Sequence, residues 1–184
     1  MSRRFEQDAT RSIRAFAQFV SPVLQTAFNA KRIEPTENHG DTLATLLDRL
    51  AGIDGAIVDG NNEILLYASR VQFGKNYKAF SIRFSRPSGA MTEYEKLARA
   101  IQRNSVRPAV HVQTFVDDGE HCADVGIVKT CDLIAFLSKH QNQRRTSKTG
   151  EDFLYAEWRQ LPSVKVFHVD GDGRAVEKKK AAID

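Results

Sequence analysis

The central part of the chain, residues 41–137, alternates between helical and strand-like spacing of its apolar residues, and this order restricts the folds that it can adopt. The spacing predicts these elements in chain order: a helix that begins at Asp41 and ends at Gly52, strands over 53–58, 63–71 and 79–84, a helix from Thr92 to Ile101, strands over 108–116 and 124–130, and a short helix over 132–137. The order helix-strand-strand-strand-helix-strand, followed by one more strand and helix, predicts an α/β fold with a mixed central sheet.

Local signals support the ends of these elements. Asp41 is a suitable helix cap, and the leucines that follow it at helical spacing predict one apolar face: Leu43, Leu46, Leu47 and Leu50. Thr92 and Glu95 have the spacing of a capping box. Residues 59–62 (Asp-Gly-Asn-Asn) have the composition of a hairpin turn, so we expect the strands on either side to pair.

The segment before the core, residues 1–40, combines a helix with a linker. Apolar residues recur at helical spacing from Phe5 to about Phe28, which predicts an amphipathic helical arm. Residues 31–40 contain proline, asparagine and glycine, as linkers do. We expect the arm to pack on the core or on a second copy of the chain, so a homodimer through this helix is one predicted assembly.

The segment after the core begins where the composition changes. The predicted α/β core spans residues 41–140, and residues 141–184 form a C-terminal extension. This extension opens with a basic stretch that contains no acid, which predicts a mobile loop. A strand pair over 153–158 and 164–169 and a tail are expected to follow.

Composition excludes several classes of protein. The chain has 184 residues and a formal net charge of +4, and no apolar run approaches the roughly 18 residues of a membrane span, so we expect no membrane partner. Its two cysteines, Cys122 and Cys131, lack metal-binding spacing, which favours reduced thiols in a cytoplasmic protein. The sequence has no phosphate-cradling glycine loop, GxSxG, HExxH or dinucleotide fingerprint, so kinases, hydrolases of those types and dehydrogenases have no support.

The predicted hairpin contains the candidate catalytic residues. It reads GIDGAIVDGNNEILLYASRVQ, with Asp54 near its start. This segment and the element order resemble the PD-(D/E)xK nuclease superfamily, especially its Holliday-junction-resolvase and restriction-endonuclease branch. The resemblance covers about residues 41–116. It implies a restriction-endonuclease-like core in which Asp54 holds Mg²⁺ or Mn²⁺ for hydrolysis of a DNA phosphodiester.

The chain departs from the family pattern on the second hairpin strand. Folding at the turn brings Asp54 opposite Tyr67 and Ala68, where the family has Glu-x-Lys and this chain has Ala68-Ser69-Arg70. The second carboxylate is therefore missing, and an arginine replaces the lysine. Because a guanidinium does not readily lose its proton, Arg70 is expected to clamp a phosphate and not to act as a base.

A metal site at Asp54 needs another oxygen ligand. Asp48 lies on the preceding helix, and Gln72 lies two residues beyond Arg70, on the same strand face by alternation. Glu63 is less suitable because about five residues of strand separate it from the level of Asp54. The catalytic candidates are thus Asp54, Arg70 and Gln72, and the candidate metal ligands are Asp54, from the resemblance, with Asp48 or Gln72 as the replacement for the missing carboxylate.

These residues also have purely structural interpretations. Asp54 suits the turn that precedes the first strand, and Arg70 and Gln72 suit a solvent-facing strand position. His111 and Gln113 alternate with valines, so they either face the same cleft or are ordinary half-exposed strand residues. The sequence leaves both interpretations open.

Basic side chains gather in two parts of the chain. The first group lies on or beside strand 79–84, with Tyr77 and Phe80 between its members: Lys75, Lys78, Arg83 and Arg86. The second group lies in the expected loop: Arg144, Arg145 and Lys148. Basic and aromatic side chains together are typical of surfaces that contact phosphates and bases, so nucleic acid is the predicted partner and DNA is favoured.

Two functions agree with these features. The first is a divergent PD-(D/E)xK-like, Mg²⁺-dependent DNA endonuclease. The alternative is a catalytically inactive nuclease-fold protein that serves in nucleic-acid binding or assembly.

Overall fold

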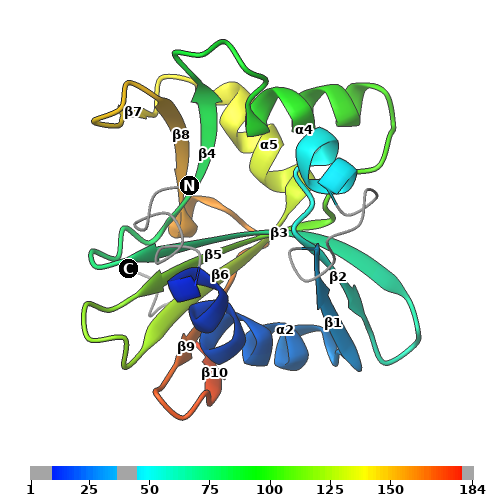
Figure 1. Ribbon diagram of the computed structural model, residues 1–184, viewed down its shortest axis with the longest axis vertical. Coiled ribbons are helices and arrows are strands. Elements are labelled where there is room, and N and C mark those ends of the chain that lie inside the picture. The colour runs from blue at the N-terminus through cyan, green and yellow to red at the C-terminus, as the bar shows by residue number, and fades with distance from the viewer. Residues whose placement is uncertain (1–9, 37–44, 180–184) are drawn as a thin grey trace.

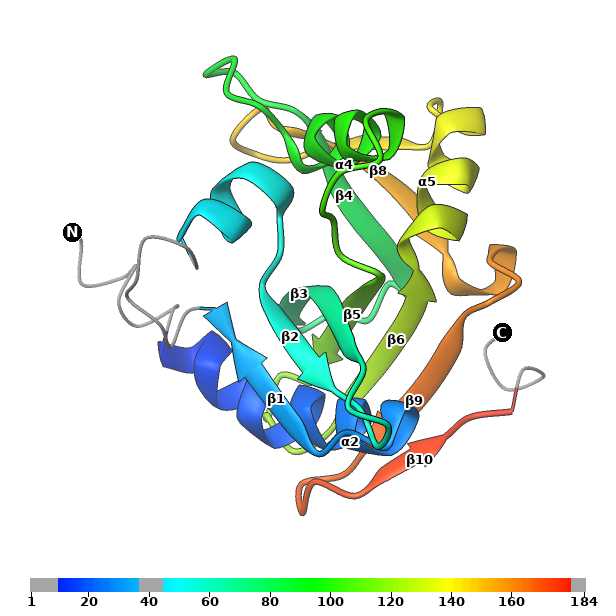
Figure 2. The same cartoon turned by 90° about the vertical axis from the view of Figure 1, so that its right-hand side faces the viewer.

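The structure, a computed structural model, describes residues 10–36 and 45–179. It contains a curled, mixed seven-stranded sheet and a separate three-stranded sheet, with helices on both faces of the larger one (Figures 1 and 2). This confirms the expected α/β class and the mixed sheet.

The seven-stranded sheet is built around the predicted hairpin. Its strands, in spatial order, are β1 (Arg32–Pro35), β2 (Gly55–Val58), β3 (Ile64–Phe73), β5 (Val110–Val116), β6 (Ala123–Lys129), β9 (Lys165–Val169) and β10 (Ala175–Glu177). β3 and β5 are parallel, and the other neighbouring strands are antiparallel. A parallel pair needs a long crossover, and the chain between β3 and β5 leaves the sheet to form β4 and α4 (Glu93–Gln102).

The third expected core strand forms, but it lies outside the central sheet. β4 (Ala79–Ser85) pairs with β8 (Asp152–Glu157), which also pairs with β7 (Arg144–Thr146). This placement follows from packing, because Phe80 of β4 and Leu154 of β8 are buried together in a second apolar core. β7 occupies part of the segment that was expected to be a basic loop.

The two expected C-terminal strands also form, but they do not pair with each other. β8 belongs to the small sheet, whereas β9 lies between β6 and β10 in the large one. A short 3₁₀ turn, η4 (Trp158–Gln160), lies between them in the chain. The prediction of a pair was wrong because the strands serve different cores: Leu154 packs in the second core, whereas Phe167 and Val169 pack in the first.

The large sheet separates the two cores (Figure 1). On one face, the N-terminal helix runs from Thr10 through a wider turn, η1 (Phe16–Val20), into α2 (Ser21–Phe28), and its apolar face is buried in the first core. On the other face lie α4, α5 (Thr130–Lys139) and the small sheet. The helix that was expected to be an arm is thus part of the core. In the described part of the chain, no helix is both long and apolar enough to cross a membrane.

The helix before the hairpin is described only from Thr45 onward, so the predicted cap at Asp41 lies outside the described residues. It finishes in η3 (Leu47–Ala51) and ends as predicted at Gly52, whose φ of 64° suits glycine. Of the expected apolar leucine face, Leu43 lies outside the described residues, Leu47 is half-buried, and Leu46 and Leu50 are 43% and 64% exposed. These two leucines lie along a surface groove beside α4 and do not enter either core.

Candidate functional site

The hairpin positions Asp54 as the sequence predicted. Gly55 pairs with Tyr67, so the preceding residue, Asp54, lies at the level of Ala68. The Asp54 amide donates a hydrogen bond to the Tyr67 carbonyl at 2.9 Å, which extends the hairpin by one residue. Asp54 therefore stands beside the Ala68-Ser69-Arg70 segment, where the family resemblance implied a reactive centre.

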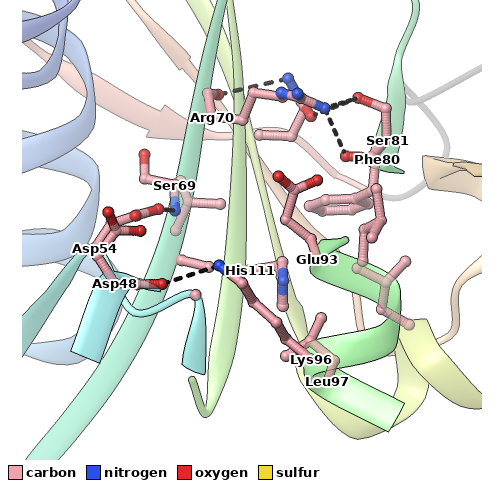
Figure 3. Close-up of a pocket in the computed structure, with 16 residues that line it drawn as sticks. Asp48, Asp54, Ser69, Arg70, Phe80, Ser81, Glu93, Lys96, Leu97 and His111 are labelled. Carbon is pink, nitrogen blue, oxygen red and sulfur yellow. Dashed lines mark hydrogen bonds between the residues drawn. The ribbon is translucent and has the colours of Figure 1, made fainter. Parts of the chain in front are cut away.

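A pocket of about 230 Å³ opens beside this segment; we call it the hairpin pocket. Residues from the end of η3, from β3, β4 and β5 and from α4 line it (Figure 3). Its charged and titratable lining residues are Asp48, Asp54, Arg70, Glu93, Lys96 and His111. Among the sequence candidates, Asp48, Asp54 and Arg70 are thus brought together, whereas Gln72 is not.

Asp54 is fixed by the backbone of β3. Its Oδ2 atom accepts a hydrogen bond from the Ser69 amide at 2.7 Å. A carboxylate that accepts a backbone N–H bond is held in one orientation, and here it lies next to the Arg70 backbone. The turn interpretation and the site interpretation of Asp54 therefore both agree with its geometry.

Arg70 is the cation at the centre of the site. Its Nη1 atom donates to the carbonyl and the hydroxyl of Ser81, both at 3.2 Å, and its guanidinium lies 4.8 Å from the Phe153 ring centroid. Burial lowers the pKa of Arg70, whereas the nearby carboxylate of Glu93 acts to raise it; the guanidinium stays charged. Within residues 10–36 and 45–179, no carboxylate forms an ion pair with Arg70.

The other proposed ligands divide between two places. Asp48 is exposed at the rim of the hairpin pocket, and its backbone carbonyl accepts a hydrogen bond from Lys96 Nζ at 3.2 Å (Figure 3). Gln72 does face the same side of β3 as Arg70, but it lines a different pocket and accepts a bond from Gln113 Nε2 at 3.3 Å. Glu63 is exposed at the far end of the hairpin, outside the hairpin pocket, as the sequence indicated.

Helix α4 contributes two residues that were not singled out from the sequence, Glu93 and Lys96. The predicted capping box fixes the start of this helix: the Glu95 amide donates to the Thr92 hydroxyl at 3.3 Å, and the Thr92 amide donates to the Glu95 carboxylate at 2.8 Å. These hydrogen bonds also lower the pKa of Glu95. Spacing of three places Glu93 and Lys96 on one helix face, which was the available signal, but the sequence did not show what this face meets.

Glu93 is engaged by two of the arginines that were proposed to bind nucleic acid. Its carboxylate accepts bonds from the Arg83 amide at 2.9 Å and from Arg83 Nη1 at 3.2 Å, and it pairs with Arg86 Nη2 at 3.4 Å. Arg83 also pairs with Glu151 at 3.0 Å. Both arginines are therefore neutralised within the chain, which leaves less of their charge for a ligand.

His111 faces the hairpin pocket from β5. Burial lowers its pKa to about 4, so the imidazole is neutral at physiological pH. Its Nδ1 atom is 3.0 Å from the Thr130 hydroxyl. His111 is therefore one of the candidate cleft residues that do face the site, and it adds a neutral hydrogen-bonding group to it.

The donor set for a divalent cation is small. Across residues 10–36 and 45–179, no group of three or more histidine, cysteine, aspartate and glutamate side chains is arranged to hold a metal ion. Asp48 and Asp54 supply two carboxylates to one pocket. Mg²⁺ keeps several of its waters and is commonly bound by one or two carboxylates with substrate phosphates, so an ion held here would take part of its ligands from water and substrate.

The remaining basic candidates lie on or beside the small sheet: Lys75, Lys78, Arg144, Arg145 and Lys148. Arg144 Nε donates to the Gln141 carbonyl at 2.6 Å, whereas the Arg145 guanidinium lies over the rings of Tyr77 and Tyr155. Phe80, expected to accompany them, is instead buried in the second core.

Comparisons of the chain with protein-family models, with curated proteins and with solved structures found no match.

Proposed function

We propose that this chain binds nucleic acid, with DNA as the favoured form, on a divergent PD-(D/E)xK-like core, and that Arg70 contacts a backbone phosphate. The observation that carries the proposal is the half-buried Arg70 guanidinium, which is not ion-paired with a carboxylate in the described part of the chain. A charge removed from water is costly unless an opposite charge compensates it, and a phosphate oxygen is a suitable partner for a guanidinium.

The surroundings of Arg70 agree with this role. Only Nη1 of its guanidinium donates hydrogen bonds to described residues, although a guanidinium carries five N–H donors. Lys96 adds a second cation to the hairpin pocket. Lys75 and Arg145 extend the positive charge along the neighbouring small sheet, so a strand anchored at Arg70 meets further cations there.

The test is a binding titration with labelled single-stranded DNA, duplex DNA and RNA of one sequence, followed by fluorescence anisotropy. Arg70→Ala is expected to weaken binding about 10- to 100-fold, the range for loss of a hydrogen bond to a charged group. Arg70→Lys keeps the charge without the planar fork, so its affinity is expected to lie between the two.

Arg174→Ala is the matched control, because it removes the same charge from an exposed position before β10, on the opposite side of the molecule from the small sheet (Figure 1). It is expected to bind as the wild-type chain does. Equal weakening by Arg70→Ala and Arg174→Ala would mean that only net charge matters, and it would contradict the proposed contact.

A second candidate function is Mg²⁺- or Mn²⁺-dependent cleavage of branched or single-stranded DNA. The observation that favours it is that Asp48 and Asp54 line the same pocket as Arg70. In this proposal Asp54 and Asp48 would hold the cation, which stabilises charge on a scissile phosphate, and Arg70 would hold that phosphate. Gln72 drops out of the proposed ligand set because it lines the other pocket.

Cleavage is measured on branched and single-stranded DNA with Mg²⁺, Mn²⁺ or chelator. Asp54→Asn is expected to lower a metal-dependent rate by about 100-fold or more, since a catalytic cation contributes several kcal/mol to transition-state stabilisation. Asp172→Asn, at an exposed turn between β9 and β10, is the control and is expected to leave the rate unchanged. Equal rates for the wild-type chain and Asp54→Asn would exclude this second function.

A further inference from the structure

A second pocket lies on the other side of Arg70, between β3 of the large sheet and the small sheet; we call it the intersheet pocket. Its volume is about 530 Å³, within the range of about 300–1,000 Å³ that is usual for ligand sites. Arg70 lines both this pocket and the hairpin pocket. A ligand group held by Arg70 therefore has direct access to either space.

The intersheet pocket is lined by aromatic rings contributed from separate elements. These are Tyr77 before β4, Phe115 of β5, and Phe153 and Tyr155 of β8. Polar side chains stand among them: Gln72, Ser81, Thr146, Ser147 and Glu157. Flat apolar walls with a few hydrogen-bonding groups at their edges suit a flat ligand that has both a π-face and a polar edge.

At the rim of the pocket, the planar guanidinium of Arg145 lies over two of these rings. The Arg145 guanidinium carbon lies 4.7 Å from the Tyr155 ring centroid and 5.2 Å from the Tyr77 centroid. Arg145 is exposed on a three-residue strand and Tyr77 is 46% exposed, so both are accessible from solvent. A nucleobase can take the place of the guanidinium against the rings, which releases Arg145 to pair with a phosphate.

We infer that the intersheet pocket takes one unstacked nucleobase of a single-stranded segment, stacked against Tyr77 and Tyr155. The inference rests on the proposed function, because Arg70 would hold the phosphate of the strand whose base enters the pocket. Bases inside a duplex are covered by their neighbours, so this site selects unpaired nucleotides. Gln72 and Glu157 offer hydrogen-bonding groups to the edge of the base.

The experiment compares two labelled strands with the full-length chain: oligothymidylate of about 12 nucleotides, within the usual site sizes of about 4–16 nucleotides, and an abasic strand of the same length. Both carry the same phosphates, and only the first carries bases. The thymidylate strand is expected to bind about 5- to 150-fold more tightly, the range for stacking of one base. Tyr77→Ala is expected to remove this difference, whereas Tyr77→Phe, which keeps the ring, is expected to retain it.

Folding of each variant is checked by the emission of Trp158, the only tryptophan of the chain, which is buried in the second core. If both strands bind equally, or if Tyr77→Ala keeps the preference for bases, the nucleobase pocket is wrong while the phosphate contact stands. If neither strand binds, the proposed function fails as well.

Free thymidine monophosphate, added as a competitor, separates the two sources of a nucleobase. It is expected to displace the thymidylate strand only weakly, because the strand has additional phosphate contacts. Displacement at equal nucleotide concentration would assign the pocket to free nucleotides and overturn the inference of a single strand.

Discussion

Arg70 and Asp54 are neighbours in space because of one hairpin register, yet their surroundings differ. Asp54 receives a backbone hydrogen bond from Ser69 and stays at the edge of the hairpin pocket. Arg70 contacts Ser81 and Phe153, and its half-buried side chain lines both the hairpin pocket and the intersheet pocket. At the scale of single residues, the site is thus an anchored carboxylate beside a half-buried cation that has no ion pair among the described residues, which is the basis of the proposed phosphate contact.

His111 provides a prediction for pH dependence. Because burial lowers its pKa from 6.5 to about 4, the unfolded chain binds more protons at this residue between those pH values. The free energy of unfolding is therefore expected to fall as the pH drops from 6.5 towards 4. In His111→Gln, which keeps a hydrogen-bonding group near Thr130, this fall is expected to be smaller by about 2–3 kcal/mol at pH 4.5.

Urea unfolding of both proteins at pH 7 and pH 4.5, followed by Trp158 fluorescence, measures this difference. Other groups titrate in the same range, but they are common to both chains and cancel in the comparison. Identical pH profiles for the wild-type chain and His111→Gln would show that His111 titrates normally.

At the scale of elements, the small sheet lines both pockets: β4 contributes to the hairpin pocket, and β4, β7 and β8 contribute to the intersheet pocket. Alternation in the sequence was sufficient to predict β4 and β8 as strands and to pair β2 with β3 through a short turn. It was not sufficient to pair β4 with β8, because Phe80 and Ala156 are partners far apart in the chain and local patterns do not encode such pairing.

At the candidate site, too, local contacts were predictable from the sequence and long-range contacts were not. The approach of Asp54 to Arg70 was predictable because the hairpin is local, and the capping box at Thr92 was predictable from two residues. The sequence did not predict that Gln72 lines the intersheet pocket or that Glu93 lines the hairpin pocket, because each placement depends on which element packs over the sheet. Phe153 and Tyr155 alternate on β8 and therefore share a face, but only the folded chain brings that face to Arg70.

The junction between the two sheets supplies an element-scale prediction. Trp158 follows β8 and packs directly on Gly126 of β6, where an added Cβ would lie 2.6 Å from the indole Cε2 atom. Gly126→Ala is expected to lower the free energy of unfolding by about 1–3 kcal/mol, as overpacking of a core does. Urea denaturation followed by far-ultraviolet circular dichroism measures this loss.

Trp158→Phe removes part of the indole, so the clash should be relieved in a double variant. The cost of Gly126→Ala is expected to be smaller in the Trp158→Phe background than in the wild-type chain. Strictly additive costs would mean that the two residues do not constrain each other.

At the scale of the whole molecule, the two cores lie on opposite faces of the large sheet, and different elements cover each of them. The N-terminal helix closes the first core, while the small sheet and α4 surround the second core and both pockets (Figure 1). The apolar face of that helix is buried within the chain. The homodimer expected through this helix stays a prediction. Acids neutralise Arg83 and Arg86, whereas Lys75 and Arg145 lie over Tyr77 at the intersheet pocket. Part of the positive charge behind the formal net charge of +4 therefore lies beside this pocket.

The central claim is that Arg70 contacts a backbone phosphate, and the salt dependence of binding tests it most directly. The logarithm of the association constant for single-stranded DNA is measured against the logarithm of salt concentration for the wild-type chain, Arg70→Ala and Arg174→Ala. Loss of one phosphate contact is expected to make the slope shallower by about 0.7 for Arg70→Ala, with Arg174→Ala unchanged. Equal slopes for the wild-type chain and Arg70→Ala would contradict the account.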